Sequence, residues 1–352
     1  MTVSLCTFNV NNLFLRYKFG SSFPGDMSAL SESDNVKWGY LPLYKKGLFE
    51  IFKPAQRDLA QQALTLDDGS RPDIVCLQEV ESLMALRAFN EHHLGGYYPY
   101  AMLVDSRDLR QIDVGVLSRY PLCRVRSNVD LADPADDGFP WLFSRDCLEF
   151  AVEFNKSGSR RLSVFVNHFK SKLVQGGSAA AVAEASERAL QKRVRQANGV
   201  LNILRSRFPG SDYDKAMFAV VGDLNDEPSS PAIQPFVQAG RLENAVERLP
   251  EAQRWTHYYK AKGQVSQFDY LLLSPRLAAA SAGELPFVQR QGIGFREPSK
   301  TDGKPLPQKV KVVRGEGDAA PLSVDFRFPR YAGVSQELVA SDHCPVTMRL
   351  AV

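Results

Sequence analysis

The sequence predicts an α/β protein in which buried strands alternate with helices. Short runs at residues 3–8, 73–77, 216–221 and 268–273 are mostly apolar and rich in β-branched or aromatic side chains, as buried strands tend to be. A long stretch after Ser178 has apolar residues at helical spacing instead. With 352 residues, of which 44% are apolar, the chain can bury a large core.

The expected elements follow one another in two halves of similar rhythm. In chain order they are a strand at 3–9, a helix at 54–66, a strand at 73–78, a helix after Ser82, several strands over 97–167, a long helix from Ser178, and strands at 216–222, 268–273 and 345–350. Because no tandem repeat or flexible linker divides the chain, residues 1–352 are expected to form one domain.

The long helix is expected to have an apolar face and a basic face. Apolar residues recur at spacings of three and four, at Leu190, Val194, Ala197, Leu201, Leu204 and Phe208. Arg188, Lys192 and Arg195 fall on the opposite side of the helix. A helix with this pattern covers a sheet with its apolar face, which leaves the three bases free for phosphate contacts.

Overall composition excludes some classes of protein. The 43 Lys and Arg residues against 40 Asp and Glu residues leave a net charge of +3, far from that of an obligate polyelectrolyte binder. Residues 1–20 lack a signal-peptide pattern, and no run approaches the roughly 18 apolar residues of a membrane span. The five cysteines include no CxxC pair and are expected to be free thiols. We therefore expect a cytoplasmic protein without stable membrane association.

Polar clusters follow the ends of the apolar runs. They are TFN at 7–9, LQE at 77–79, GDLN at 222–225 and SDH at 341–343. A folded sheet can bring such strand ends together into one pocket. Carboxylates there supply oxygen ligands for a divalent metal, and His343 supplies a group that titrates near neutral pH. This combination predicts a metal-dependent hydrolase.

Eight segments in one order resemble the endonuclease/exonuclease/phosphatase superfamily. They are TFNVNNLF at 7–14, DIVCLQEVE at 73–81, DVGVLSRYP at 113–121, SRDCLEF at 144–150, VNHFKSK at 166–172, VVGDLNDEP at 220–228, FDYLLLS at 268–274 and SDHCPV at 341–346. That superfamily includes DNase I-like nucleases, abasic-site endonucleases, inositol polyphosphate 5-phosphatases and neutral sphingomyelinases. The resemblance implies an α/β (α+β) fold of the DNase I type: a four-layer sandwich of two packed mixed β-sheets flanked by helices.

The resemblance also implies a metal site. Glu79 is then the main ligand, with Asn9 beside it and Asp342 completing the set. The alternative for Glu79 is a carboxylate that stabilises the start of the next helix. Three oxygen donors suit Mg²⁺ or Mn²⁺, and no His/Cys cluster at zinc spacing is present to favour Zn²⁺.

Two groups of residues are implied to act on the attacking water and on the phosphate. Alternation places Asp223 and Asn225 on one side of an extended chain, so the carboxylate can orient water while the amide holds a phosphate oxygen. The alternative is a simple turn. His343, oriented by Asp269, is implied to activate or stabilise the same water.

Residues near the leaving group are implied by the same resemblance. His168 is expected to pair with an acidic residue, which we place at Asp113. Arg145 fits the arginine of an S-R-E/D motif and is expected to contact phosphate, although a structural salt bridge is the alternative. Lys170 is a further expected phosphate contact. The other three histidines match no motif and are expected to be structural: His92, His93 and His257.

Two long segments, at about 16–53 and 279–339, look like insertions. Both are rich in aromatic or basic residues, and seven bases lie between Arg290 and Arg314. Long connections of this kind either serve function or stay as solvated loops. If they serve function, they are expected to border the site.

Three functions agree with these patterns. The favoured one is a nuclease that hydrolyses phosphodiester bonds of DNA or RNA by in-line attack of water. The alternative is a phosphatase or a phospholipase C-like enzyme acting on inositol phosphates or sphingomyelin. A non-catalytic binding module is disfavoured, because the catalytic positions of the superfamily are all filled. The patterns carry no information on oligomeric state.

Overall fold

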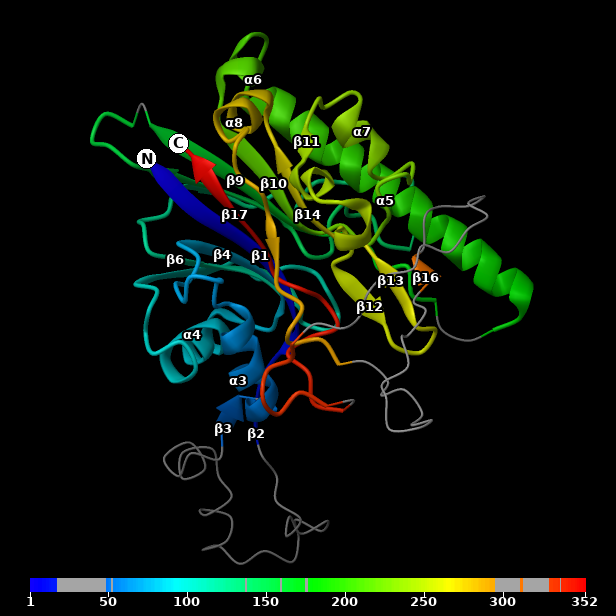
Figure 1. The fold of residues 1–352 in the computed structure, drawn as a ribbon. Coiled ribbons are helices and arrows are strands. Elements are labelled where there is room, and N and C mark those ends of the chain that lie inside the picture. The colour runs from blue at the N-terminus through cyan, green and yellow to red at the C-terminus, as the bar shows by residue number, and fades with distance from the viewer. Residues whose placement is uncertain are drawn as a thin grey trace, which may run out of the picture.

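Two mixed β-sheets pack face to face, and helices cover their outer faces (Figure 1). This computed structural model describes residues 1–17, 49–51, 53–136, 138–158, 160–174, 177–294, 311–312, 329–335 and 337–352. Within these residues each of the two sheets has six strands. The predicted four-layer sandwich is thereby confirmed.

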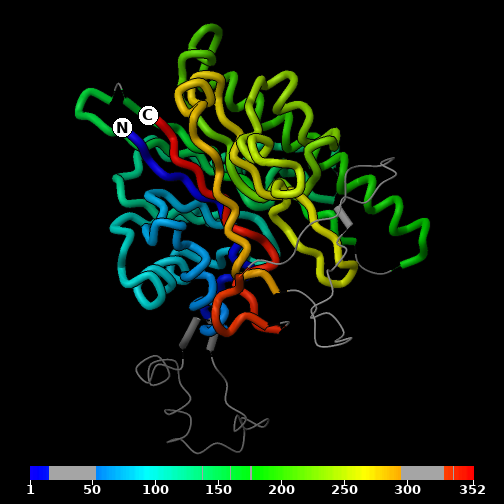
Figure 2. Tube along the Cα trace, viewed as in Figure 1, coloured from blue at the N-terminus to red at the C-terminus, as the bar shows by residue number. Residues whose placement is uncertain are grey.

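The first sheet has the strand order β15-β17-β1-β4-β6-β5. Its central strand β1 is parallel to β4 and antiparallel to β17, so the two ends of the chain lie side by side (Figure 2). The strands are β1 (Thr2–Leu13), β4 (Ile74–Val80), β5 (Tyr100–Leu103), β6 (Asp113–Ser118), β15 (Phe287–Val288) and β17 (Val346–Ala351).

The second sheet has the strand order β11-β14-β10-β9-β8-β7. Here β9 and β10 are parallel, whereas β14 runs antiparallel to β10. The strands are β7 (Cys123–Arg126), β8 (Cys147–Glu153), β9 (Arg161–His168), β10 (Phe218–Asp223), β11 (Glu243–Asn244) and β14 (Asp269–Leu273).

Smaller elements surround the sandwich. Two minor sheets contain β2 (Leu15–Tyr17) with β3 (Phe49–Ile51), and β12 (His257–Tyr259) with β13 (Gln264–Ser266) and β16 (Lys311–Val312). The α-helices are α3 (Pro54–Ala63), α4 (Leu83–His92), α5 (Ala179–Arg207), α6 (Asp212–Lys215), α7 (Gln234–Val237) and α8 (Pro275–Ala280). Two short 3₁₀ helices are η2 (Ala245–Arg248) and η3 (Glu251–Gln253).

The core between the sheets is made of alternate residues of the central strands. Leu5 and Cys76 of the first sheet pack with Val164, Val221 and Leu271 of the second, and all five are fully buried. Since side chains alternate across a strand, the intervening residues face the helices. The same alternation sets which polar residues at the strand ends point between the sheets.

Each outer face is covered by helices. On the first sheet, Phe8 and Leu77 pack with Leu59 of α3 and Leu86 of α4. On the second sheet, the long helix α5 contributes Ala197, Leu201 and Leu204. These three are among the apolar positions that the sequence predicts to face a sheet, and Figure 1 shows α5 lying along that side.

The basic face predicted for α5 is wrong for Lys192. This side chain is only 6% exposed, and its Nζ donates to Asp133 (2.8 Å), Asp136 (3.0 Å) and the Trp141 carbonyl (2.6 Å). Arg195 donates to Asp133 as well, at 2.9 Å. The loop that contains Asp133, Asp136 and Trp141 crosses this face and accepts hydrogen bonds from both bases. Lys192 is therefore not free to bind a phosphate.

The predicted insertions lie largely outside the described residues. At the edge of the second one, Arg290 is half-buried. Its guanidinium stacks 4.5 Å from the centre of the Trp255 ring and donates to the Trp255 carbonyl at 2.9 Å.

 The Arg290 guanidinium therefore bonds to backbone carbonyls of the protein itself. Across the described ranges, no helix is long and apolar enough to cross a bilayer.

Candidate active site

Three polar residues form one row across the second sheet. Asp223, the last residue of β10, is in register with His168 on β9 and with Asp269 on β14. They continue the inward-facing series of their strands, which is apolar until this point. All three are therefore buried at the end of the core, where the two sheets meet.

The close packing of β9 and β10 at this row requires glycine at position 222. Gly222 has φ 135°, and a Cβ built there would lie 1.8 Å from the Asn167 carbonyl oxygen. The chain then turns sharply after Asp223, whose Oδ1 accepts from the Asn225 backbone N–H at 2.9 Å. Asn225 has φ 53°, a left-handed conformation that Asn tolerates better than most residues. The GDLN motif thus fixes the direction of Asp223.

The first sheet contributes Asn9, which faces the row from the other side of the core. Its Nδ2 donates to Asp223 Oδ2 at 3.0 Å, and its Oδ1 accepts from the Asn11 N–H at 3.1 Å. Asn225 Nδ2 donates to the same Asp223 oxygen at 3.1 Å. Two amides therefore hold one carboxylate in place.

Glu79 reaches the site through a bulge in β4. The pairing of β4 with β6 shifts register between Gln78 and Val80, and Glu79 has φ 64°. A bulge of this kind re-aims a side chain that regular alternation would send to the helical face. Glu79 Oε2 accepts from the backbone N–H of Asn12 at 3.0 Å.

A buried arginine supports the neighbouring irregular end of β1. Arg57 of α3 is fully buried and donates to the carbonyls of Val10 (2.6 Å) and Asn11 (2.9 Å). Asn11 and Asn12 both have positive φ there. Arg57 therefore stabilises the backbone that holds Glu79.

The SDH segment joins the two sheets at the site. Ser341 Oγ donates to the Asn9 carbonyl at 2.7 Å and accepts from the His343 N–H at 3.1 Å. His343 Nδ1 lies 2.9 Å from Asp269 Oδ2, and its Nε2 lies 3.7 Å from Asp223 Oδ2. The structure thus brings together the imidazole and the orienting carboxylate that the sequence pairs.

Burial and charge shift the acidity of this group. Burial raises the pKa of Asp223 to about 7, with the Asp269 carboxylate adding to the shift and His343 opposing it. Burial alone would lower the pKa of His343, yet Asp269 and Asp223 raise it well above its ordinary value. Burial also raises the pKa of Glu79, and the nearby Asp342 carboxylate adds to that shift. The carboxylates of this group thus repel one another, and Asp269 and Asp342 each raise the pKa of a neighbour.

His168 does not pair with Asp113, so that prediction was wrong. Its Nε2 lies 3.5 Å from Asp223 Oδ2, and its Nδ1 is buried with no partner among the described residues. Asp113 instead accepts from the N–H and the hydroxyl of Ser106. Asp113 is the first residue of β6, so its side chain serves the connection between β5 and β6. Burial raises the pKa of Asp113 to about 6.

Arg145 lies beside the site with two of its donors already used. Its Nε donates to Asp108 at 2.8 Å, and its Nη1 donates to the Phe169 carbonyl at 2.7 Å. The same carbonyl accepts from Asn225 Nδ2 at 3.2 Å. This is the structural salt bridge that the sequence left open for Arg145. Contacts of Arg145 and Asn225 with phosphate stay predictions.

Two cations lie exposed near the group. Lys170 lies two residues after the end of β9, and its Nζ has no partner among the described contacts. Arg110, which the sequence did not single out, lies on the loop between β5 and β6 and has a 56% exposed side chain. Burial lowers the pKa of His168 well below its ordinary value, and the charges of Arg145, His343 and Arg110 add to that shift. His168 is therefore a neutral imidazole.

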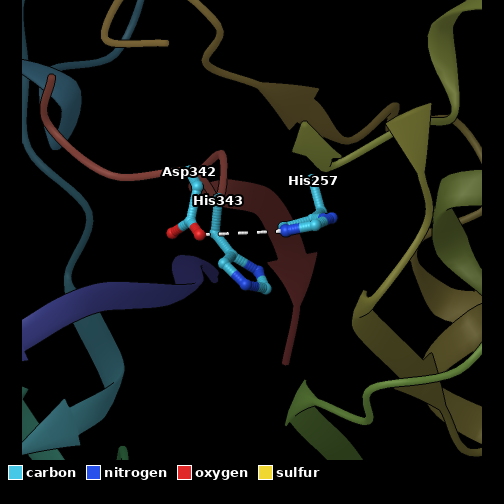
Figure 3. A group of neighbouring side chains, drawn as sticks. All are labelled: His257, Asp342 and His343. Atoms are coloured by element: carbon cyan, nitrogen blue, oxygen red, sulfur yellow. Dashed lines mark ion pairs between the residues drawn. The ribbon is translucent and has the colours of Figure 1, made fainter. Parts of the chain in front are cut away.

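His257 was predicted to be structural, but it lies in the site (Figure 3). It forms an isolated antiparallel bridge with His343, and its Nε2 lies 3.9 Å from Asp342 Oδ2. Its ring is 4.6 Å from the ring of His343. No sequence motif marks His257, and only the position of β12 beside the SDH segment reveals it. His92 is exposed and His93 pairs with Asp58, both on or beside α4.

Two groups of side chains in the described residues have donor atoms close enough to hold a metal ion. One is Asp223, Asp269 and His343, and the other is His257, Asp342 and His343. Glu79 is electrostatically coupled to Asp342 and His343, so its carboxylate belongs to the same neighbourhood. Carboxylate oxygens with a few imidazole nitrogens form a donor set suited to divalent cations.

Fold and site together define a class: a two-sheet sandwich with a group of carboxylates, amides and imidazoles at the strand ends. The profile of the Endonuclease/Exonuclease/phosphatase family matches residues 6–343, and the chain belongs to that family. Its members hydrolyse phosphoester bonds, generally with a divalent metal. No match was found among curated protein sequences.

Solved structures with this fold include proteins of different function. Truncated TDP2 from Caenorhabditis elegans has 12% identity and a TM-score of 0.52, covering 100% of this chain and 98% of that one. The human nocturnin catalytic domain, with a bound sulfate anion, has 13% identity and a TM-score of 0.52, covering 99% and 94%. Sphingomyelinase C from Streptomyces griseocarneus has 18% identity and a TM-score of 0.50, covering 99% of both chains. Such low identities establish the fold alone.

Proposed function

We propose that the protein is a cytoplasmic, divalent-metal-dependent phosphodiesterase that hydrolyses DNA or RNA, with residues 1–352 acting as one domain. The observation that carries the proposal is the row His168, Asp223 and Asp269, which faces Asn9 and His343 across the core. A neutral imidazole, a carboxylate with a pKa near 7 and a charged imidazole in one group suit proton transfer and phosphate charge stabilisation.

The residues present fit Mg²⁺ or Mn²⁺. Burial and Asp342 raise the pKa of Glu79, which is the repulsion that a bound cation would relieve. Glu79 and Asp342 would hold the cation with Asn9, whose Oδ1 accepts one hydrogen bond and keeps a second lone pair. When bound, the cation would neutralise charge on the phosphate and act as a Lewis acid.

Each surrounding side chain then has a distinct task. Asp223, held by two amides, would orient the attacking water and accept its proton. His343, which Asp269 keeps protonated, would stabilise the negative charge that develops on the phosphate. Neutral His168, whose Nε2 lies 3.5 Å from Asp223 Oδ2, would act near the leaving group. Arg145 would act as a positioning residue, since it holds the Phe169 carbonyl to which Asn225 also donates.

Exposed cations beside the site favour a nucleic acid over a small ester. Arg110 and Lys170 are both exposed and both within electrostatic range of Arg145. Adjacent phosphates of a polynucleotide can contact such groups while one phosphate occupies the site. Because Lys192 on the α5 face is buried and Arg290 donates to the Trp255 carbonyl, we expect Arg110 and Lys170 to make these phosphate contacts instead.

Product analysis on a substrate panel tests the proposal. Single-stranded DNA, double-stranded DNA and RNA are incubated with Mg²⁺ or Mn²⁺, beside sphingomyelin and inositol phosphates. We expect cleavage of a nucleic acid that disappears in His343→Ala and weakens as salt rises. The matched control is His93→Ala, which changes an imidazole–carboxylate pair far from the site. Hydrolysis of a lipid or an inositol phosphate with no nucleic acid cleaved would reject the nuclease and support the alternative.

A further inference from the structure

His257 is fixed against the SDH segment by backbone and ring contacts. Besides its bridge with His343, the neighbouring Tyr258 N–H donates to the Asp342 carbonyl at 2.9 Å. The imidazole stacks on Phe268, with ring centroids 4.9 Å apart and planes at 20°. The ring therefore has little freedom to turn, and its Nε2 is directed at Asp342 as Figure 3 shows.

The gap between His257 Nε2 and Asp342 Oδ2 suits a shared cation. At 3.9 Å the two atoms are too far apart for a hydrogen bond. Two ligands of one divalent ion, each about 2.1 Å from it, can lie up to about 4.2 Å apart. The Asp342 side chain is 50% exposed, so solvent and a substrate phosphate can reach the same point.

We propose that His257 Nε2 and Asp342 Oδ2 together bind a divalent transition-metal ion at the entrance of the site. This inference rests on the proposed function, because the ion would lie beside the phosphate that the site hydrolyses. The proposed site does not use His343, whose Nδ1 lies 2.9 Å from Asp269 Oδ2 and whose Nε2 lies 3.7 Å from Asp223 Oδ2. Water and substrate oxygens would complete the coordination.

The nitrogen donor determines which ions this second position prefers. An imidazole suits Zn²⁺ and neighbouring transition metals, whereas Mg²⁺ takes oxygen ligands. Glu79, Asn9 and Asp342 offer only oxygens, so His257 adds a preference that the motifs do not contain. Residue spacing in the sequence does not indicate this site, because His257 and Asp342 come from distant segments.

Metal titration by calorimetry, with Zn²⁺, Co²⁺ and Mg²⁺ as separate probes, tests the proposal without using activity. His257→Phe keeps the stacking on Phe268 and removes the ligand, and His257→Gln serves as a second variant. We expect both to lose about tenfold or more in affinity for Zn²⁺ and Co²⁺, while Mg²⁺ affinity changes less than about twofold. Circular dichroism establishes that each variant is folded.

Two further variants separate this inference from the proposed function. His93→Phe removes an imidazole that lies 2.8 Å from the Asp58 carboxylate, and it should leave every affinity unchanged. Glu79→Gln should weaken Mg²⁺ binding instead. Equal Zn²⁺ and Co²⁺ affinity in wild type and the folded His257 variants would overturn the inference. Failure of the proposed function would appear separately, as no hydrolysis of any nucleic acid while metal binding follows the expected pattern.

Discussion

Replacing Asp269 with Asn tests whether this carboxylate acts on the reaction only through His343. Asp269 Oδ2 lies 2.9 Å from His343 Nδ1, and its Oδ1 is buried without a partner among the described residues. The side chain therefore has His343 as its one hydrogen-bond partner in the part of the chain that the structure describes. A hydrogen bond between charged groups contributes about 1.5–3 kcal/mol, so the single variant should lose about 10–100-fold in turnover.

His343→Ala should cost more, because it removes the group that acts on the phosphate or the water. Positioned acid or base groups contribute about 10²–10⁴-fold. In the His343→Ala background, Asp269→Asn should then cost less than about twofold, since residues that act as a unit do not contribute independently. The same second change should also raise stability, because it neutralises a buried carboxylate that has lost its partner.

The assay is the initial rate of phosphodiester hydrolysis for wild type, both single variants and the double variant. Urea unfolding of each supplies the stability comparison, and circular dichroism establishes folding. Multiplicative losses for the two changes would refute the pairing. Asp269 would then have a second route to the reaction, and the role given to His343 would have to be changed.

Three further predictions concern groups around the site. Arg57→Met should destabilise the fold by about 2–5 kcal/mol, because two carbonyls lose their donor, and should weaken metal binding through Glu79; calorimetry and urea unfolding measure both. Lys192→Met should cost about 3–5 kcal/mol, because buried Asp133 keeps only Arg195 as a partner and the Trp141 carbonyl loses its donor, whereas exposed Arg188→Gln should cost less than about 0.5 kcal/mol; equal effects would contradict the burial of Lys192. Asp113→Asn should be more stable than wild type at pH 8 by about 1–3 kcal/mol and equal to it near pH 4.

The sign for Asp113 follows from its raised pKa. The folded protein holds the proton to about pH 6, whereas an unfolded Asp releases it near its ordinary value. Wild type is therefore favoured while the carboxyl is protonated and loses that stability as pH rises through about 6. Asn carries no charge and avoids the loss. Unfolding curves whose difference stays constant from pH 4 to pH 8 would contradict this account.

The sandwich and most of the site could be predicted from the sequence. Apolar runs identified the central strands, because a buried strand needs a continuous apolar stretch. Polar residues at the ends of those runs, such as Asn9, Asp223 and Asp269, then had to meet wherever the sheets packed. The periodicity of the long helix also identified Ala197 and Leu201 as sheet-facing residues.

Other features depend on tertiary contacts that local patterns do not contain. Regular alternation would turn Glu79 toward the helices, and the bulge that redirects it uses positive φ at a non-glycine residue. Helical periodicity placed Lys192 opposite the sheet but could not show that the loop at 128–146 covers it. His257 enters the site only because β12 pairs with the SDH segment. The partner of His168 likewise depends on strand register, which brought Asp223 rather than Asp113 beside it.

The most direct test of the central claim is the rate of hydrolysis of bis(p-nitrophenyl) phosphate by wild type and His343→Ala, each with Mg²⁺ or Mn²⁺ and with excess chelator. The account predicts that wild type needs the metal and that His343→Ala loses about 10²–10⁴-fold of the metal-dependent rate while remaining folded. Hydrolysis that persists in excess chelator, or a folded His343→Ala variant with the wild-type rate, would contradict it.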